Sequence, residues 1–189
     1  WTGGVPTIPW INGLKDPSPR HIGQLQMRPE DSKSAMILYE RRRQGLATKL
    51  ADINQLAQFK LQVTHHLSEH GMDSIAHVPD PHSPTASTHI IDSHTRFTVT
   101  SCEVAISAQL KEYDDYDHET DRAAVSFLFA SLDPARAESL RHRCHKADDS
   151  PYGEVMDPFP IVWLHLMQDV APASYETYRP LPSKLKRLN

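Results

Sequence analysis

The sequence predicts an all-α fold: a small multi-helix orthogonal bundle with an extended Pro-rich N-terminal arm and a mobile Pro/Ser/His loop. Apolar residues recur at helical spacing in several successive segments. The fifteen prolines leave two long gaps, at 30–78 and 85–133. Because an interior proline costs a helix about 3 kcal/mol or more, long helices are expected in those gaps.

The chain divides into three parts. We expect an extended arm at 1–29, a helical domain at 30–170 with a mobile loop at about 79–95, and a Pro-rich, basic tail at 171–189. An apolar fraction of 39% and a mean hydropathy of -0.52 are low for a compact globule, so part of the chain is expected outside any core. Because the chain opens on Trp1 rather than Met, we expect a fragment with a truncated tail.

Two long helices are expected after the arm. The first begins after Pro29 and reaches Gln44, and Gly45 interrupts it. The second covers about Leu46 to His70, and Gly71 is placed to end it in a left-handed conformation. The apolar stripe of this second helix contains Ile53, Leu56, Val63 and Leu67, with Phe59 beside it.

The middle of the chain contains a loop, one short strand and a helix. Residues 72–95 include the Pro/Ser/Thr/His-rich loop, and Arg96 to Thr100 is the one convincing strand-like run. The spacing of Thr100 and Glu103 is that of a capping box. A helix from there to about Tyr113 would align Cys102, Ile106, Leu110 and Tyr113.

Three helix-like segments follow in succession. The first, Asp121 to Leu132, shows one apolar face. The second segment is expected to begin at Pro134, which has the fixed φ of a first helical residue. Asp133 is expected to cap its free amides. The third segment begins at Pro160 and carries Trp163, Leu166, Met167 and Val170 at offsets of 0, 3, 4 and 7. We expect one core formed by Phe59, Leu67, Leu128, Leu132, Leu140 and Trp163.

The histidines are the residues that could bind a metal ion. His66 and His70 are four apart on a helix, but Leu67 stands where a zinc-protease helix has Glu. His142, Cys144 and His145 lack the second pair of ligands that a structural zinc site uses. We therefore expect no metal, no cofactor and no catalytic residue.

Other chemical motifs receive a structural interpretation. The acidic run at 112–121 resembles a calcium loop, but Thr120 and Ser126 occupy positions that need Gly and Glu. A solvated turn whose acids cap the next helix is the simpler interpretation. No phosphate-binding glycine loop and no G-x-S-x-G motif is present. The basic runs Arg41 to Arg43 and Lys184 to Arg187 are expected to be solvated helix ends.

Composition limits the partners and the compartment. A net charge of -4 argues against a chain-wide basic surface for nucleic acid. No signal peptide and no apolar run long enough for a membrane span is visible, so we expect a cytoplasmic protein without a membrane partner. Cys102 and Cys144 are expected as buried thiols in a reducing compartment, with a disulfide as the alternative.

Four segments follow one another along the chain: Phe59 to Met72, with an aromatic and a Leu-x-x-x-Gly ending, Asp121 to Leu132, with a terminal Ser-Leu, the short Pro134 to His145, and Val162 to Met167, with a Trp-x-x-Leu/Met pattern. Their order resembles the N-terminal half of the capsid-like region in Gag polyproteins of copia-type LTR retrotransposons. The resemblance covers about 46–170 and rests on helix order and core positions. Two departures are the long segments 79–95 and 148–158, and the second capsid half and a zinc knuckle are absent.

The resemblance implies self-assembly into a shell around RNA. We expect a structural protein, not an enzyme, with weak self-association, indirect RNA association through missing parts, and no small-molecule substrate. One alternative is a small metal-dependent enzyme or sensor; another is a generic helical adaptor. The metal alternative requires convergence of His66, His70, His142 and His145, whereas the capsid-like interpretation requires their dispersal and a buried Trp163 against Leu128 and Leu132.

Overall fold

The computed structural model describes residues 32–80, 83–145, 155 and 157–171. The predicted arm at 1–29, nearly all of the tail at 171–189 and most of the segment 148–158 lie outside the described residues.

The described chain is mostly helical, as the sequence predicts, with one antiparallel hairpin added. The α-helices are α1 (Ser32–Arg43), α2 (Leu56–Glu69), α3 (Ile90–Ser93), α4 (Val99–Lys111), α5 (Asp115–Ala130), α6 (Pro134–Arg143) and α7 (Phe159–Val170). The 3-10 helices are η2 (Ile53–Gln55), η3 (Asp73–Ala76) and η4 (His94–Arg96), and the strands are β1 (His77–Asp80) and β2 (Ser83–His89).

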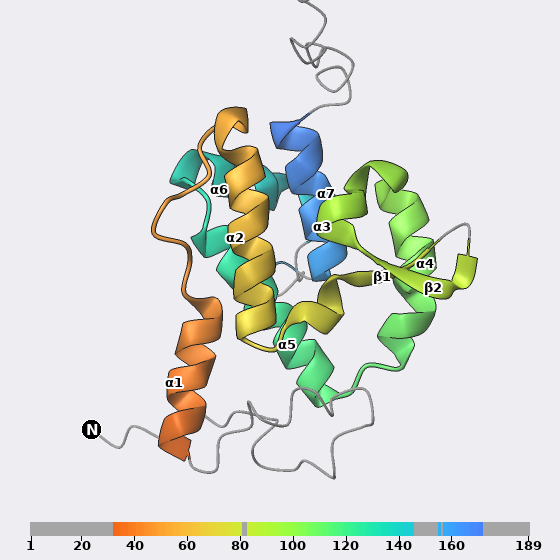
Figure 1. The fold of residues 1–189 in the computed structure, drawn as a ribbon, viewed down its shortest axis with the longest axis horizontal. Coiled ribbons are helices and arrows are strands. Elements are labelled where there is room, and N and C mark those ends of the chain that lie inside the picture. The colour runs from red at the N-terminus through yellow and green to blue at the C-terminus, as the bar shows by residue number, and fades with distance from the viewer. Residues whose placement is uncertain (1–31, 81–82, 146–154, 156, 172–189) are drawn as a thin grey trace, which may run out of the picture.

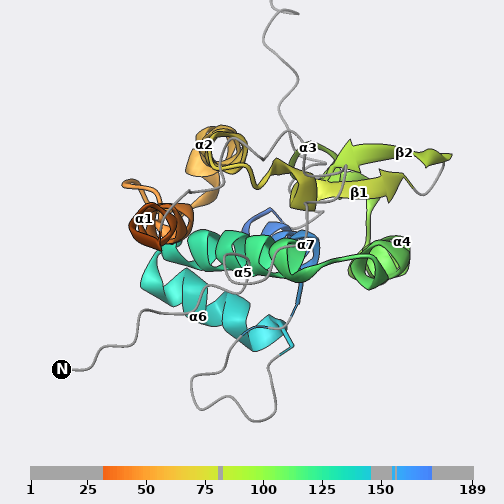
Figure 2. The same cartoon turned by 90° about the horizontal axis from the view of Figure 1, so that it is seen from below.

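The elements are arranged around α5 and α7, which pack against each other (Figure 1). Figure 2 shows α2 and the hairpin on one side of this pair and α6 on the other. Helix α4 contacts both α7 and β1, and α1 contacts α5. The centre of the domain is therefore made by two helices from the C-terminal half of the chain.

The core is built around Trp163, which is completely buried. Its ring is parallel to that of Phe59, with centroids 6.2 Å apart, and it also stacks on Phe159 at 6.1 Å. Helix α7 is apolar on nearly all sides because neighbouring elements surround it. The structure places all six residues of the predicted core in one hydrophobic cluster: Phe59, Leu67, Leu128, Leu132, Leu140 and Trp163.

Helix α1 is held to the domain by buried polar contacts. Arg42 is only 2% exposed, and its guanidinium donates to the Tyr116 hydroxyl at 2.7 Å and to the His70 carbonyl at 3.1 Å. Arg43 forms an ion pair of 2.9 Å with Glu119. The prediction that this basic run is a solvated helix end is wrong for Arg42, because a hydroxyl and a carbonyl replace its water.

The segment between α1 and α2 is not helical at its start, contrary to the predicted helix from Leu46 to His70. Leu50 instead forms an isolated bridge with Leu132, in which the Leu50 amide donates to the Ser131 carbonyl at 3.0 Å. Gly45 lies close to Ala130 at the end of α5, and residues 44–52 around it are not helical. Gly71 has φ 65° and ends the helical region as predicted.

The predicted loop at 79–95 and the predicted strand at Arg96 to Thr100 are wrong. The loop range contains β2 and α3, and the strands of the described chain are β1 and β2. Thr98 instead caps α4, with its hydroxyl accepting from the Ser101 amide, so the capping box begins two residues earlier than predicted. The β-branched residues of the run from Arg96 to Thr100 favour a strand, but the cap at Thr98 starts a helix there.

The acidic run forms the predicted turn between α4 and α5 at 112–114, where an acid caps the next helix, and it is helical from Asp115 onward. Asp114 caps α5 and accepts from the Asp117 amide at 3.0 Å, so the helix begins at Asp115. Asp117 and Glu119 are buried. The next boundary agrees with prediction: Asp133 accepts from the Ala135 amide at 3.0 Å and caps α6. The acids of this region thus act in helix capping and packing.

The two cysteines are buried and unlinked. Burial raises the pKa of Cys102 to about 12, which keeps this thiol protonated and unreactive at neutral pH. Among the described residues, no helix has both the length and the apolar character needed to cross a bilayer.

Asp121 on α5 caps the first turn of α7. Its carboxylate accepts from the Phe159 amide at 2.9 Å, at a helix start where Pro158 offers no side-chain cap. The residue keeps a solvent-accessible edge, but its carboxyl is enclosed by protein atoms. This burial raises the pKa of Asp121 from 3.8 to about 7, even though the bond from Phe159 acts in the opposite direction.

This shift predicts a pH-dependent stability. The pKa of Asp121 in the folded protein lies above its value in the unfolded chain. Its contribution to the free energy of unfolding is therefore fully present below about pH 4 and is lost as the pH rises through about 7. An Asp121→Asn variant stays neutral and keeps an oxygen for the Phe159 amide. We expect its melting temperature, relative to the parent, to rise between about pH 4 and pH 8. A difference that is the same at both pH values contradicts the assignment.

Candidate functional site

The structure brings two of the predicted candidate histidines together and separates them from the others. His66 on α2 and His70, which caps the C-terminal end of that helix, contact edge to face, with ring centroids 4.3 Å apart. His66 also stacks on Phe127 at 3.8 Å, and its Nε2 lies 3.1 Å from the Arg42 carbonyl. Burial lowers the pKa of both histidines. His66 is therefore engaged in packing between α2 and α5.

The other candidates lie at the end of α6. His142 is exposed and pairs with Glu138, one helical turn earlier, at 3.2 Å. His145 Nδ1 lies 2.8 Å from Asp157 Oδ1, and this bond raises the pKa of His145. In the part of the chain that the structure describes, the four predicted histidines do not form a shared group of possible ligands.

A different cluster unites Asp73, His77 and His89, which is the one group of three or more possible metal ligands among the described residues. Asp73 begins η3, His77 begins β1 and His89 ends β2. His77 and His89 are directly opposed in the hairpin. Because directly opposed residues project to the same side of a sheet, both imidazoles lie on one face.

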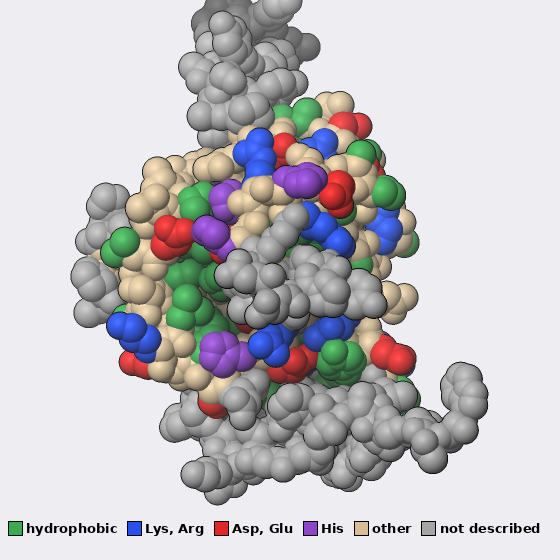
Figure 3. Space-filling view, turned by 180° about the vertical axis from the view of Figure 1, so that it is seen from behind, with side chains coloured by type: hydrophobic (Ala, Val, Ile, Leu, Met, Phe, Trp, Pro, Cys, Tyr) green, Lys and Arg blue, Asp and Glu red, His purple; other side chains and the backbone are tan. Residues whose placement is uncertain are grey.

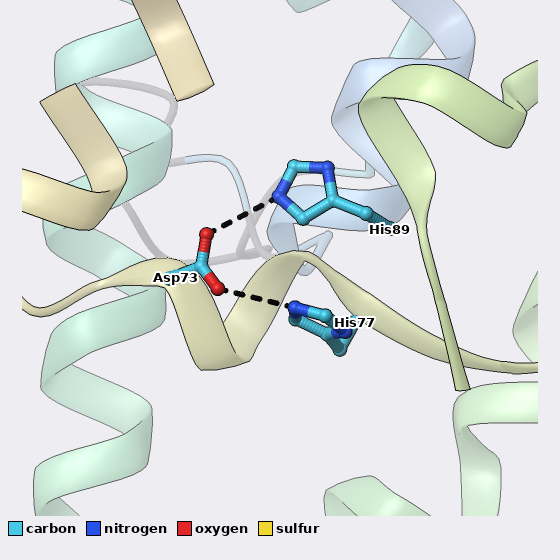
Figure 4. A group of neighbouring side chains, drawn as sticks. All are labelled: Asp73, His77 and His89. Atoms are coloured by element: carbon cyan, nitrogen blue, oxygen red, sulfur yellow. Dashed lines mark hydrogen bonds and ion pairs between the residues drawn. The ribbon is translucent and has the colours of Figure 1, made fainter. Parts of the chain in front are cut away.

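The carboxylate of Asp73 lies between the two imidazoles (Figure 4). Its Oδ2 is 3.1 Å from His77 Nε2, and its Oδ1 is 3.4 Å from His89 Nε2. The two rings meet edge to face with centroids 5.2 Å apart. One chosen ligand atom from each residue lies within 4.8 Å of the other two. The three side chains thus converge on one small volume.

The cluster is open on one side. Asp73 and His77 have side chains 44% and 39% exposed, whereas that of His89 is 15% exposed. Burial lowers the pKa of His89, with the Asp73 carboxylate acting in the opposite direction. Neither ring nitrogen of His89 has a well-aligned hydrogen bond to a described residue. A neutral imidazole has a lone pair on one ring nitrogen, so His89 can act as a metal ligand.

Sequence reasoning missed this cluster because it placed 79–95 in a loop. The four-residue spacing of Asp73 and His77 is visible in the sequence. His89, however, joins them through the antiparallel register of the hairpin. The available signal was the match between Ala76-His77-Val78 and His89-Ile90-Ile91, in which each histidine adjoins apolar residues. A hairpin interpretation of this region would have paired them.

The fold and the cluster define a mostly helical domain with a two-stranded hairpin whose base carries two imidazoles and a carboxylate. Comparisons with protein-family models, curated proteins and solved structures found no significant match to this chain.

Proposed function

We propose that the protein is a structural domain that acts through protein–protein contacts, and that it is a Gag-like capsid piece of a retrotransposon. The observation that supports this proposal is the burial of Trp163 between Phe59 and Phe159. Leu128 and Leu132 belong to the same cluster. The capsid-like interpretation requires a closing Trp buried against these two leucines, and their membership of one cluster with Trp163 supports it. We further propose that α2, α5, α6 and α7 form the orthogonal bundle of that class.

The separation of His66 and His70 from His142 and His145 supports the same proposal over the enzyme alternative. His66 packs on Phe127, His142 pairs with Glu138, and His145 pairs with Asp157. A metal enzyme built on these residues would need them in one place. Each instead has a contact that serves local structure.

The helix surfaces offer places for weak contacts between copies. Leu61 on α2 and Val104 on α4 are 72% and 71% exposed, and Ile37 on α1 is 42% exposed. Single exposed apolar residues are ordinary on a monomer. In a lattice subunit, however, several small contacts on different helices are what assembly uses. Leu61 is therefore the residue at which we would test for a contact.

The charge distribution supports an indirect relation to RNA. Arg42 is buried and Arg43 is paired with Glu119, so two members of the basic run are already engaged. On the coloured part of the face in Figure 3, positive and negative side chains are interspersed. We expect little RNA binding at physiological salt, because a few phosphate contacts are strongly weakened there. Tight, sequence-specific binding in a filter or polarisation assay would contradict this expectation.

Sedimentation velocity over about a hundredfold range of concentration tests the proposal. We expect a monomer when dilute and a rising weight-average sedimentation coefficient as concentration increases, because contacts below ~1,200 Å² are weak. A Leu61→Lys variant should reduce the rise, since it puts a charge into an apolar contact. Gln58→Lys is the matched control, one turn away on the same exposed face of α2. A strict monomer throughout contradicts the proposal and favours the adaptor.

A further inference from the structure

We propose that Asp73, His77 and His89 form a binding site for a divalent transition metal of the zinc class. This inference is independent of the assembly proposal and concerns residues other than the histidines considered from the sequence. The spacing of the ligand atoms, the fixed backbone at each ligand and the chemistry of the donors favour this site.

The spacing fits a tetrahedral ion. Zinc binds imidazole nitrogen and carboxylate oxygen at about 2.0–2.2 Å, so neighbouring ligand atoms of a tetrahedral site lie about 3.3 Å apart. The Asp73 oxygens lie 3.1 Å from His77 Nε2 and 3.4 Å from His89 Nε2. One ligand atom from each of the three residues lies within 4.8 Å of the other two, so an ion among them would draw the three side chains together.

The backbone at each ligand is fixed by adjacent buried residues. His77 lies between Ala76 and Val78, which are completely buried, and His89 precedes the equally buried Ile90. Asp73 lies two residues before Ile75, which is 2% exposed. Ligands held in this way lose little conformational entropy when they bind an ion.

Hydrogen bonds to the ligand residues add to this support. Gln109 on α4 donates its side-chain amide to the His77 carbonyl at 3.3 Å. The Ser93 hydroxyl donates to the His89 carbonyl at 2.7 Å. The hairpin base is thus tied both to α4 and to α3, so the two imidazoles keep their relative position.

The chemistry of the donors selects the kind of ion. Two imidazoles and one carboxylate suit zinc and neighbouring transition metals, whereas magnesium and calcium prefer oxygen ligands alone. Three protein ligands on an open surface leave the remaining position for water. Such an ion would link η3 to both strands and stabilise the hairpin.

The test is equilibrium binding of Zn²⁺ to the full, untagged chain, with Co²⁺ as a spectroscopic probe. We expect one equivalent of Zn²⁺ per chain, visible d–d absorption from Co²⁺, and an increase in melting temperature with Zn²⁺ that a chelator reverses. Mg²⁺ and Ca²⁺ should give no increase. His77→Gln should weaken Zn²⁺ binding by about tenfold or more, and because His77 is partly exposed this change should leave the fold intact.

His142→Gln and His65→Gln are the matched controls, since both residues are exposed histidines on helices. We expect each control to bind Zn²⁺ like the parent. Asp73→Asn gives a second variant of the site, and circular dichroism establishes that each variant is folded. The proposal is overturned if the parent binds no Zn²⁺, or if His142→Gln weakens binding as much as His77→Gln and Asp73→Asn do.

Discussion

Replacing Trp163 with alanine is expected to lower the free energy of unfolding by about 3–5 kcal/mol. The ring is completely buried and stacks on both Phe59 and Phe159, so its removal leaves a cavity between α2 and α7. Chemical denaturation monitored by circular dichroism measures this loss. Leu61→Ala is the control, because that side chain is 72% exposed and its truncation should change stability by less than about 0.5 kcal/mol.

A Trp163→Phe variant separates the ring from its polar atom. The indole N–H is buried with no hydrogen-bond partner among the described residues. Phenylalanine keeps an aromatic ring and removes this unpaired donor, so the loss should be well below that of the alanine variant. A Trp163→Ala protein that unfolds at the same denaturant concentration as the parent would refute the packing of α7.

Replacing Gly45 with alanine is expected to destabilise the domain by about 1–3 kcal/mol. A Cβ at this position would overlap the backbone carbonyl of Ala130 and would lie 2.9 Å from the Ala130 Cβ. Since backbone atoms cannot move aside as a flexible side chain does, the whole segment must shift. That shift would disturb the Leu46 amide, which donates to the Ser131 hydroxyl at 3.0 Å, and the bridge at Leu50.

Gln44→Ala is the matched control for Gly45→Ala. Gln44 is exposed and adjacent, so its truncation should leave the denaturation midpoint nearly unchanged. If Gly45→Ala is as stable as Gln44→Ala, the close approach of this segment to the end of α5 is incorrect.

The parts of the fold that were predicted from the sequence are those fixed by local chemistry. Asp133 and Pro134 mark the start of α6 because a side-chain oxygen and a fixed φ act within one turn. Gly71 follows the end of α2 with φ 65°, a conformation that glycine adopts without steric cost. The helical spacing of the apolar residues around Trp163 is also a local feature, and it indicated α7.

The parts that were missed depend on contacts between distant segments. The hairpin pairs His77 with His89, and two prolines in its strands made the region resemble a loop. A proline can occupy these positions because a two-stranded sheet has two free edges. Local propensity carries little information about such a pairing, so the expected loop was the wrong result.

Burial of charge was also not readable from the sequence. Arg42 lies in a run of three arginines, which is typical of a solvated helix end. Its burial results from the position of Tyr116, seventy-four residues further along the chain. The candidate site was missed in the same way: the individual residues were visible, but the register that unites them is a tertiary property.

Sequencing of the transcript beyond the codon for Asn189 tests most directly whether this domain is a Gag-like capsid piece. We expect a continuous reading frame that encodes the second half of a capsid region, followed by a protease, an integrase or a reverse transcriptase. A frame that continues into an unrelated enzyme or adaptor domain would contradict it.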